Sequence, residues 1–249
     1  MMLKVSNLNK NFNGVTALKE FSFEMKENEI LGMIGPNGAG KTTFFNVLSG
    51  FIKPESDKLE FLGKDITNLS SHKIVSSGIS RTFQDLRLIR QISVIDNVLL
   101  SFNHQTGENF YNILFKQKSW QETEELDKHK ALKLLEYAGI KDKAFDLAND
   151  LSYGQQKLLS ITCCLAADAK LLLLDEPIAG INPEMREKIL RIISELPSKG
   201  KSAIIIEHDM DFIERICDRV IFMDMGEKIS EGTSEEVRND PKVIEAYLE

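Results

Sequence analysis

A loop with the chemistry of a phosphate-binding site lies near the start of this 249-residue chain. Its residues, Gly35-Pro36-Asn37-Gly38-Ala39-Gly40-Lys41-Thr42, fit the pattern G-x-x-x-x-G-K-[ST]. Glycines leave room for backbone N–H groups to turn inward around phosphate oxygens. The Lys41 ammonium can reach the β- and γ-phosphates of a nucleotide, and the Thr42 hydroxyl can ligate Mg²⁺. This segment, called the phosphate loop below, therefore predicts phosphate binding but not which class of nucleoside triphosphatase (NTPase) the chain belongs to.

Two adjacent carboxylates, Asp175 and Glu176, form the second candidate site. They follow the apolar run Leu171–Leu174, and the pattern predicts a buried parallel strand over Lys170–Asp175. Asp175 is placed to orient Mg²⁺ through its water shell, and Glu176 is placed to polarise a water for attack on a γ-phosphate. An acid pair is only modestly specific by itself. Together with the phosphate loop it indicates a site that uses Mg²⁺ to hydrolyse a nucleoside triphosphate such as ATP.

The sequence around these residues predicts an α/β protein. The apolar run Ile30–Ile34 predicts a buried strand that leads into the phosphate loop, and Thr42–Leu48 looks helical. Further expected elements are strands at Leu3–Leu8, Ala17–Met25, Lys58–Leu62 and Ser202–Glu207, helices at Pro183–Leu196, Met210–Ile216 and Pro241–Leu248, and a hairpin of Val220–Asp224 with Glu227–Ser230.

Between about residues 83 and 150 the chain becomes rich in long polar and helix-forming residues. Apolar residues there stand near helical spacing, as at Leu126, Leu132, Leu135 and Ala138. We expect a mostly helical lobe inserted into an α/β core made of residues 1–82 and about 151–249. For residues 103–120 we expect a loop and a short helix.

The bulk composition narrows the class of protein. The hydrophobic fraction of 42% suits a globular fold, and the net charge of -7 argues against a bulk nucleic-acid binder. The three cysteines, Cys163, Cys164 and Cys217, have neither the number nor the spacing of a disulfide framework or zinc site. No run of about 18 apolar residues predicts a membrane span. We expect a soluble chain in a reducing compartment.

With both motifs placed, the chain resembles the ATP-binding cassette (ABC) ATPases over essentially its whole length. The phosphate loop and the acid pair match the Walker A and Walker B motifs of that family. The other matches are Phe12 for the aromatic residue that stacks on adenine, Gln84 for the Q-loop glutamine, Leu151-Ser152-Tyr153-Gly154-Gln155 for the LSGGQ signature, Ala179-Gly180-Ile181-Asn182 for the D-loop, and His208 for the switch histidine. Each is weak alone, but their shared order and spacing are specific.

The resemblance implies a P-loop NTPase core with an N-terminal antiparallel β subdomain and an inserted, mostly helical subdomain, in a single nucleotide-binding domain over residues 1–249. It implies catalytic roles for Glu176, His208 and Gln84, and metal contacts from Thr42, Gln84 and Asp175. Thr43 joins the phosphate loop and Phe12 in nucleotide binding.

The resemblance also implies a second ABC ATPase subunit, related or identical, in a head-to-tail dimer. In this family the signature does not reach the phosphate loop of its own chain. Ser152, Tyr153, Gly154 and Gln155 are therefore expected to contact the ATP held by the partner, with the D-loop residue Asn182 nearby.

Departures from the family pattern narrow the resemblance further. Tyr153 stands where glycine is usual, Asn182 where aspartate is usual, and Asp57 replaces a common glycine. With Arg81-Thr82-Phe83-Gln84, these features are similar to the LivG-type ATPase subunits of branched-chain amino acid importers. The implied partners are two membrane permease subunits and, indirectly, a solute-binding protein, with no nucleic acid. The implied location is peripheral, on the cytoplasmic face of the cell membrane.

Two other interpretations remain at this point. An ATPase of another ABC system, such as lipopolysaccharide export, would be expected to keep two glycines in the signature and aspartate in the D-loop. A soluble ABC ATPase acting on ribosomes or DNA typically has two cassettes or a long coiled coil, and this chain has neither. The sequence leaves the transported solute and the identity of the partner ATPase open.

Overall fold

The chain folds into two compact units, each assembled from segments that are distant in sequence. The computed structural model describes residues 1–55, 58–83, 86–102 and 117–246. The first unit consists of Met1–Arg81, Lys170–Ala179 and Ile193–Glu249, and the second consists of Thr82–Ala169 and Gly180–Ile192. Gln84 and most of the loop and short helix expected at 103–120 lie outside the described residues.

An antiparallel sheet opens the first unit, as the sequence predicts. Within the described residues its strands run in the order β2-β1-β4-β5. The bounds are Leu3–Phe12 for β1, Val15–Met25 for β2, Lys58–Phe61 for β4 and Lys64–Asp65 for β5. Strands β1 and β2 form a long hairpin that places Phe12 opposite Val15.

A larger sheet carries the predicted buried strands. Its order within the described residues is β10-β9-β3-β8-β7-β6, and only the β9–β10 pairing is antiparallel. The bounds are Ile30–Ile34 for β3, Ile79–Arg81 for β6, Leu171–Asp175 for β7, Ser202–Ile206 for β8, Arg219–Asp224 for β9 and Glu227–Gly232 for β10. Strands β3, β7 and β8 are buried along their whole lengths, which explains their continuous apolar runs.

The register of this sheet brings together segments that follow different strands. Strand β8 lies between β3 and β7, and its last residue, Ile206, is paired with both Met33 and Asp175. Because the strands are parallel, their carboxyl ends meet at one edge of the sheet. That edge carries the phosphate loop, which follows β3, together with Glu176, which follows β7, and His208, which lies just after β8.

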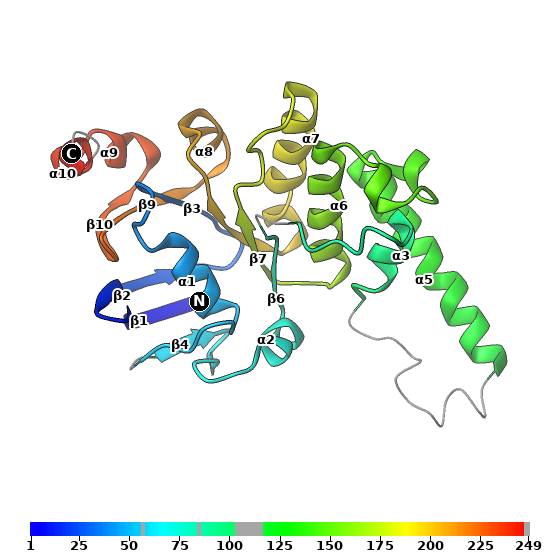
Figure 1. Cartoon of the computed structure of the whole chain (residues 1–249), viewed down its shortest axis with the longest axis horizontal. Helices are drawn as coiled ribbons and strands as arrows, with labels where there is room; N and C mark the ends of the chain where they lie inside the picture. Colours follow the sequence, from blue (N-terminus) through cyan, green and yellow to red (C-terminus); the bar gives the residue numbers. More distant parts are fainter. Residues whose placement is uncertain (56–57, 84–85, 103–116, 247–249) are drawn as a thin grey trace. The chain divides into compact units, whose positions relative to one another are not determined.

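Helix α1 (Lys41–Leu48) packs between the two sheets of the first unit (Figure 1). Its residues Phe44 and Phe45 are fully buried, with ring centroids 6.2 Å apart. The Phe44 ring also lies 5.3 Å from Phe21 and 5.6 Å from Phe23 of β2. This aromatic cluster fixes the helix that directly follows the phosphate loop.

The described part of the first unit also contains four shorter α-helices and a 3-10 helix at Pro197–Lys199. The α-helices are α2 (Ser71–Ser77), α8 (Met210–Ile216), α9 (Ser234–Arg238) and α10 (Pro241–Ala246). Val237 of α9 and Val243 of α10 join Phe222 of β9 in a separate apolar cluster. The predicted hairpin and the predicted helices at 210–216 and near the C-terminus are confirmed. Helix α2 and strand β6 were not predicted.

The described part of the second unit is mostly helical, as expected for the inserted lobe. Its α-helices are α3 (Val94–Leu99), α5 (Gln117–Ala138), α6 (Tyr153–Ala166) and most of α7 (Pro183–Ser194). Helix α5 contacts both α3 and α6. The spacing of Leu135 and Ala138 predicts a buried face and both are fully buried, whereas Leu126 is exposed. The signature helix α6 belongs to this unit.

The structure also bears on the expectations about membrane-spanning helices and about the three cysteines. None of the helices in the described ranges is both long and apolar enough to cross a bilayer. Cys163, Cys164 and Cys217 are free. Burial raises the pKa of the Cys163 thiol to about 11.

The aromatic cluster under the phosphate loop gives the first prediction. Phe44→Ala should lower the free energy of unfolding by about 3–5 kcal/mol, because it opens a cavity that the surrounding rings cannot close. Urea unfolding measures this change. The matched control is Phe51→Ala, because Phe51 lies just beyond the same helix and is 48% exposed. Equal losses in the two variants would contradict the assignment of Phe44 to the core.

Candidate active site

The phosphate loop connects β3 to α1 in a conformation that requires glycine. Gly35 and Gly40 have φ angles of 145° and 98°. A Cβ atom at Gly35 would lie 2.0 Å from the Met223 carbonyl oxygen, and one at Gly40 would lie 2.4 Å from the Ala17 carbonyl oxygen. Both contacts are with backbone and cannot be relieved by a side-chain rotation. The loop is therefore packed against β2 and β9 through its glycines.

Lys41, near the end of the phosphate loop, has a buried side chain that turns back toward the start of the loop. Its Nζ donates to the carbonyl oxygens of Gly35 at 2.6 Å and Pro36 at 2.8 Å. Burial lowers the pKa of this ammonium, while the charges of Glu176 and Asp175 act to raise it. Thr42 is exposed and Thr43 is half-buried in the first turn of α1. The Lys41 ammonium is therefore bound to carbonyl oxygens of the loop, and the oxygens of a bound phosphate can replace them as its partners.

The acid pair lies at the same sheet edge, with each carboxylate in a different setting. Asp175 is the buried last residue of β7. Glu176 has a left-handed φ of 47°, and its N–H donates to the Ile206 carbonyl oxygen at 2.9 Å. A non-glycine residue in this conformation stores strain, and such strain concentrates at functional sites. His208 Nε2 lies 3.5 Å from Glu176 Oε1, so the structure brings these two predicted catalytic residues together.

Sequence reasoning missed Glu207, which braces this edge. Its side chain is almost fully buried. One carboxylate oxygen accepts from the Ile178 N–H at 2.9 Å, and the other accepts from the His208 N–H at 3.1 Å. The segment after Glu176 is thereby tied to the segment that carries His208. The signal in the sequence is a charged residue directly after the apolar run at 203–206.

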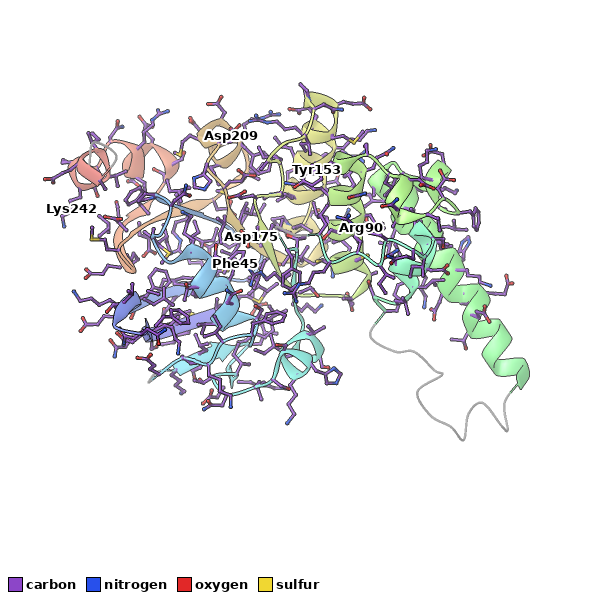
Figure 2. All side chains as sticks on the ribbon, viewed as in Figure 1. Phe45, Arg90, Tyr153, Asp175, Asp209 and Lys242 are labelled. Carbon is purple, nitrogen blue, oxygen red and sulfur yellow. The ribbon has the colours of Figure 1, made fainter. Side chains whose placement is uncertain are left out.

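Arg81 belongs to the motif Arg81-Thr82-Phe83-Gln84, but the sequence predicts no separate role for it. It ends β6, and its Nη2 lies 2.9 Å from Asp175 Oδ2, with both side chains 5% exposed. Its Nη1 donates to Asn46 Oδ1 at 2.7 Å and to Ser49 Oγ at 3.3 Å. The guanidinium also lies over the ring of Phe45, which Figure 2 labels beside Asp175.

The signature residues lie in the second unit, at the start of α6. Ser152 is the N-cap: its Oγ accepts from the Gln155 N–H, while Gln155 Oε1 accepts from the Ser152 N–H at 2.9 Å. This reciprocal pair is a capping box, and it fixes the direction in which the helix begins. Tyr153 is about half exposed, and Gly154 is buried.

The D-loop lies against the signature within the same unit. A methyl group at Gly180 would be 3.4 Å from Cε1 of Tyr153, so the tyrosine ring covers this glycine. A Cβ at Gly154 would be 2.8 Å from Cγ of Met185. Asn182 Oδ1 accepts from the Met185 N–H at 2.9 Å and so caps α7.

Two further predicted residues remain. Phe12 ends β1 with 41% of its surface exposed, and Lys10 Nζ lies 5.3 Å from its ring centroid. An exposed ring of this kind is available for stacking. The structure does not describe Gln84.

The oxygen ligands present fit a magnesium–nucleotide complex. The described residues contain no group of three or more His, Cys, Asp or Glu that could hold a metal ion. Magnesium in nucleotide sites needs few protein ligands, because phosphates and water supply the others. Thr42 and the Asp175 carboxylate match that requirement, beside a loop that already holds the Lys41 cation.

Comparisons with known proteins agree with this geometry. The family model described as ABC transporter matches residues 18–179, and the model described as branched-chain amino acid ATP-binding cassette transporter matches residues 227–248. The chain is 37% identical, over 99% of its own length and 97% of the relative, to the high-affinity branched-chain amino acid transport ATP-binding protein LivG of Salmonella typhimurium.

Solved structures are also similar over nearly the whole chain. One is a nucleotide-free ATP-binding cassette from an ABC transporter, with TM-score 0.85, 35% identity and coverage of 100% of this chain and 99% of that one. Another is a dimeric ATP-binding cassette bound to ADP and Pi, with TM-score 0.78, 25% identity and coverage of 94% and 99%.

The steric demand at the phosphate loop gives the second prediction. Gly40→Ala should lose nucleotide affinity by at least about tenfold and lower stability by several kcal/mol, because the backbone must move away from the Ala17 carbonyl. Gly63→Ala is the matched control, since Gly63 also has positive φ but has nothing within 4 Å of an added Cβ. It should cost only about 1–2 kcal/mol. Nucleotide titration and urea unfolding distinguish the two, and normal nucleotide binding by Gly40→Ala would refute the steric argument.

Proposed function

The chain belongs to the ABC transporter family, and on that premise we propose that it is the ATP-hydrolysing subunit of an importer of branched-chain, hydrophobic amino acids. The observation that carries the ATPase assignment is the meeting of the phosphate loop, Asp175, Glu176 and His208 at one sheet edge. The observation that carries the substrate is the similarity to LivG along the whole chain, with the matching C-terminal family model.

In the proposed mechanism Lys41 exchanges its two loop carbonyls for phosphate oxygens of ATP. Both contacts are local, so the ammonium moves without disturbing the fold. Phe12 stacks on the adenine ring. Thr42, Asp175 and Gln84 would hold Mg²⁺, which would supply positive charge to neutralise the phosphates.

Hydrolysis then depends on the strained acid and its histidine neighbour. Glu176 polarises the attacking water as general base. His208, which lies against Glu176, contacts the γ-phosphate and stabilises the charge that develops there. Gln84 would contact the attacking water and the metal ion. Glu207 holds the segments that carry Glu176 and His208 together, because its carboxylate accepts hydrogen bonds from the Ile178 and His208 N–H groups.

We propose that the complete site needs a second ABC ATPase subunit, related or identical, in a head-to-tail dimer. A similar cassette has been solved as a dimer with ADP and Pi. The N-terminus of α6 would meet the partner's ATP through Ser152, Tyr153, Gly154 and Gln155, because the positive end of the helix dipole favours an anion. Asn182 lies at the start of α7, where its side chain accepts a hydrogen bond from the Met185 N–H.

The remaining partners are proposed from the family. Two membrane permease subunits would form the translocation path, a solute-binding protein would deliver the amino acid, and this subunit would act peripherally on the cytoplasmic face of the membrane. The similarity to LivG favours this system over lipopolysaccharide export or a soluble non-transport ATPase.

The role of Glu176 gives the third prediction. Glu176→Gln should bind ATP with wild-type affinity and lose at least about a hundredfold in hydrolysis rate, because the amide cannot take the proton of the attacking water. Binding is measured by nucleotide titration and turnover by phosphate release. Asp168→Asn is the control, since it makes the same change at another acid with positive φ outside the proposed site. Wild-type turnover in Glu176→Gln would refute the catalytic assignment.

The proposed substrate gives the fourth prediction. Liposomes carrying the assembled transporter with internal ATP should take up radiolabelled leucine, isoleucine or valine when the binding protein is present. Uptake should vanish with Glu176→Gln, because closure and reopening of the ATPase pair drive transport. Lysine is the matched negative substrate, since its charged end is costly to place in an apolar pocket. Equal uptake of lysine and leucine would contradict the substrate assignment while leaving the ATPase assignment standing.

A further inference from the structure

We propose that Arg81 is a positioning residue that orients the Asp175 carboxylate for the magnesium–nucleotide complex and ties it to α1, the helix that begins with Lys41 and Thr42. The inference rests on the proposed assignment of Asp175 to Mg²⁺. It adds a side chain that the family motifs do not include among the catalytic groups.

The contacts of Arg81 join three elements around one guanidinium. Arg81 belongs to β6, Asp175 ends β7, and Asn46 lies in α1. Nη2 lies 2.9 Å from Asp175 Oδ2, and Nη1 lies 2.7 Å from Asn46 Oδ1. A planar fork can satisfy both acceptors at once, whereas the single ammonium of lysine cannot reproduce that geometry. The fork therefore sets the distance between the acid and the helix.

Burial makes this arrangement stiff. Both side chains of the ion pair are 5% exposed, and the guanidinium lies 5.3 Å from the centroid of the fully buried Phe45 ring. Removing one partner of a buried pair leaves an uncompensated charge that the surrounding structure must accommodate. The nearby cation Lys41 cannot replace Arg81, because it is bound to the carbonyls of Gly35 and Pro36 and is needed by phosphate.

The backbone supports the same link. Arg81 is paired with Leu173 across the parallel β6–β7 ladder, two residues before Asp175. Strand pairing and the side chain thus fix the same end of β7. A carboxylate held in this way is pre-oriented for a hydrated metal ion, and outer residues that orient metal ligands typically change metal affinity about 10–100-fold when mutated.

The test measures how strongly Mg²⁺ promotes binding of a fluorescent ATP analogue by the full chain, without measuring hydrolysis. Arg81→Gln should bind the analogue in EDTA within about twofold of wild type, because the phosphate loop is intact. It should need at least about tenfold more Mg²⁺ for half-maximal enhancement of binding. Arg81→Lys should need a Mg²⁺ concentration between those of the wild type and Arg81→Gln, because lysine keeps the positive charge but lacks the planar guanidinium.

Two controls separate positioning from general destabilisation. Asp175→Asn should raise the Mg²⁺ requirement, and adding Arg81→Gln to it should have no further effect if Arg81 acts through Asp175. Arg219→Gln removes another part-buried arginine–carboxylate pair, with Glu29 at 2.8 Å, at the far end of β9 from the phosphate loop. It should leave the Mg²⁺ requirement unchanged.

The outcomes distinguish the inference from the function beneath it. If Asp175→Asn does not change the Mg²⁺ requirement, the proposed metal role of Asp175 fails. If it does and Arg81→Gln behaves as wild type, or weakens binding equally in EDTA and Mg²⁺, the positioning role fails. If Arg81→Gln does not fold, Arg81→Lys decides: a raised Mg²⁺ requirement with normal EDTA binding supports the role, and an unchanged one overturns it.

Discussion

The parallel pairing of β8 with both β3 and β7 is the constraint on which the active site depends. The chain supplies its phosphate loop, acid pair and histidine from three segments that are far apart in sequence. Ile206 is paired with Met33 on one side and with Asp175 on the other, so the register of a single strand aligns all three. A shift of one residue in that register would turn every side chain of β8 to the opposite face. Because these strands are buried along their whole lengths, a shifted strand would have to repack against its neighbours on both faces.

Around this edge, buried polar groups give the site its stiffness. Glu207 bonds to the backbone on either side, and Arg81 bonds to the acid and to α1. Such contacts restrict a buried side chain to one orientation, and here they hold the Glu207 and Asp175 carboxylates in place. The same low-dielectric surroundings make a charge on the bound nucleotide interact strongly with Lys41 and with the acids. Burial of these polar groups therefore accounts both for the rigidity of the site and for the strength of its electrostatic interactions.

The sequence predicted this site where a local pattern has a single physical explanation. Glycines at 35 and 40 are demanded by backbone geometry, and the apolar runs at 30–34 and 171–174 by burial on both faces. The sequence did not predict α2 or β6: each is short, and β6 shows no alternation. It also could not reveal the roles of Arg81 and Glu207, because these depend on partners 94 and 29 residues away. The exposure of Leu126 shows the same limit, since periodicity marks a helix face but not what covers it.

The departures from the family pattern also follow from geometry. Tyr153 is the first residue of α6 and is absent from the residues with positive φ, so its backbone does not require glycine. A tyrosine there is better for the helix than glycine, and its ring covers Gly180. Gly154 differs, because Met185 leaves no room for a Cβ.

Asn182 caps α7 through Oδ1, a task that an aspartate oxygen performs equally well. The replacement removes one negative charge from a region proposed to lie near a second chain's ATP. Both changes therefore preserve the local backbone and alter only what the surface presents. Such substitutions are expected to affect contacts with a second chain more than they affect the fold of this one.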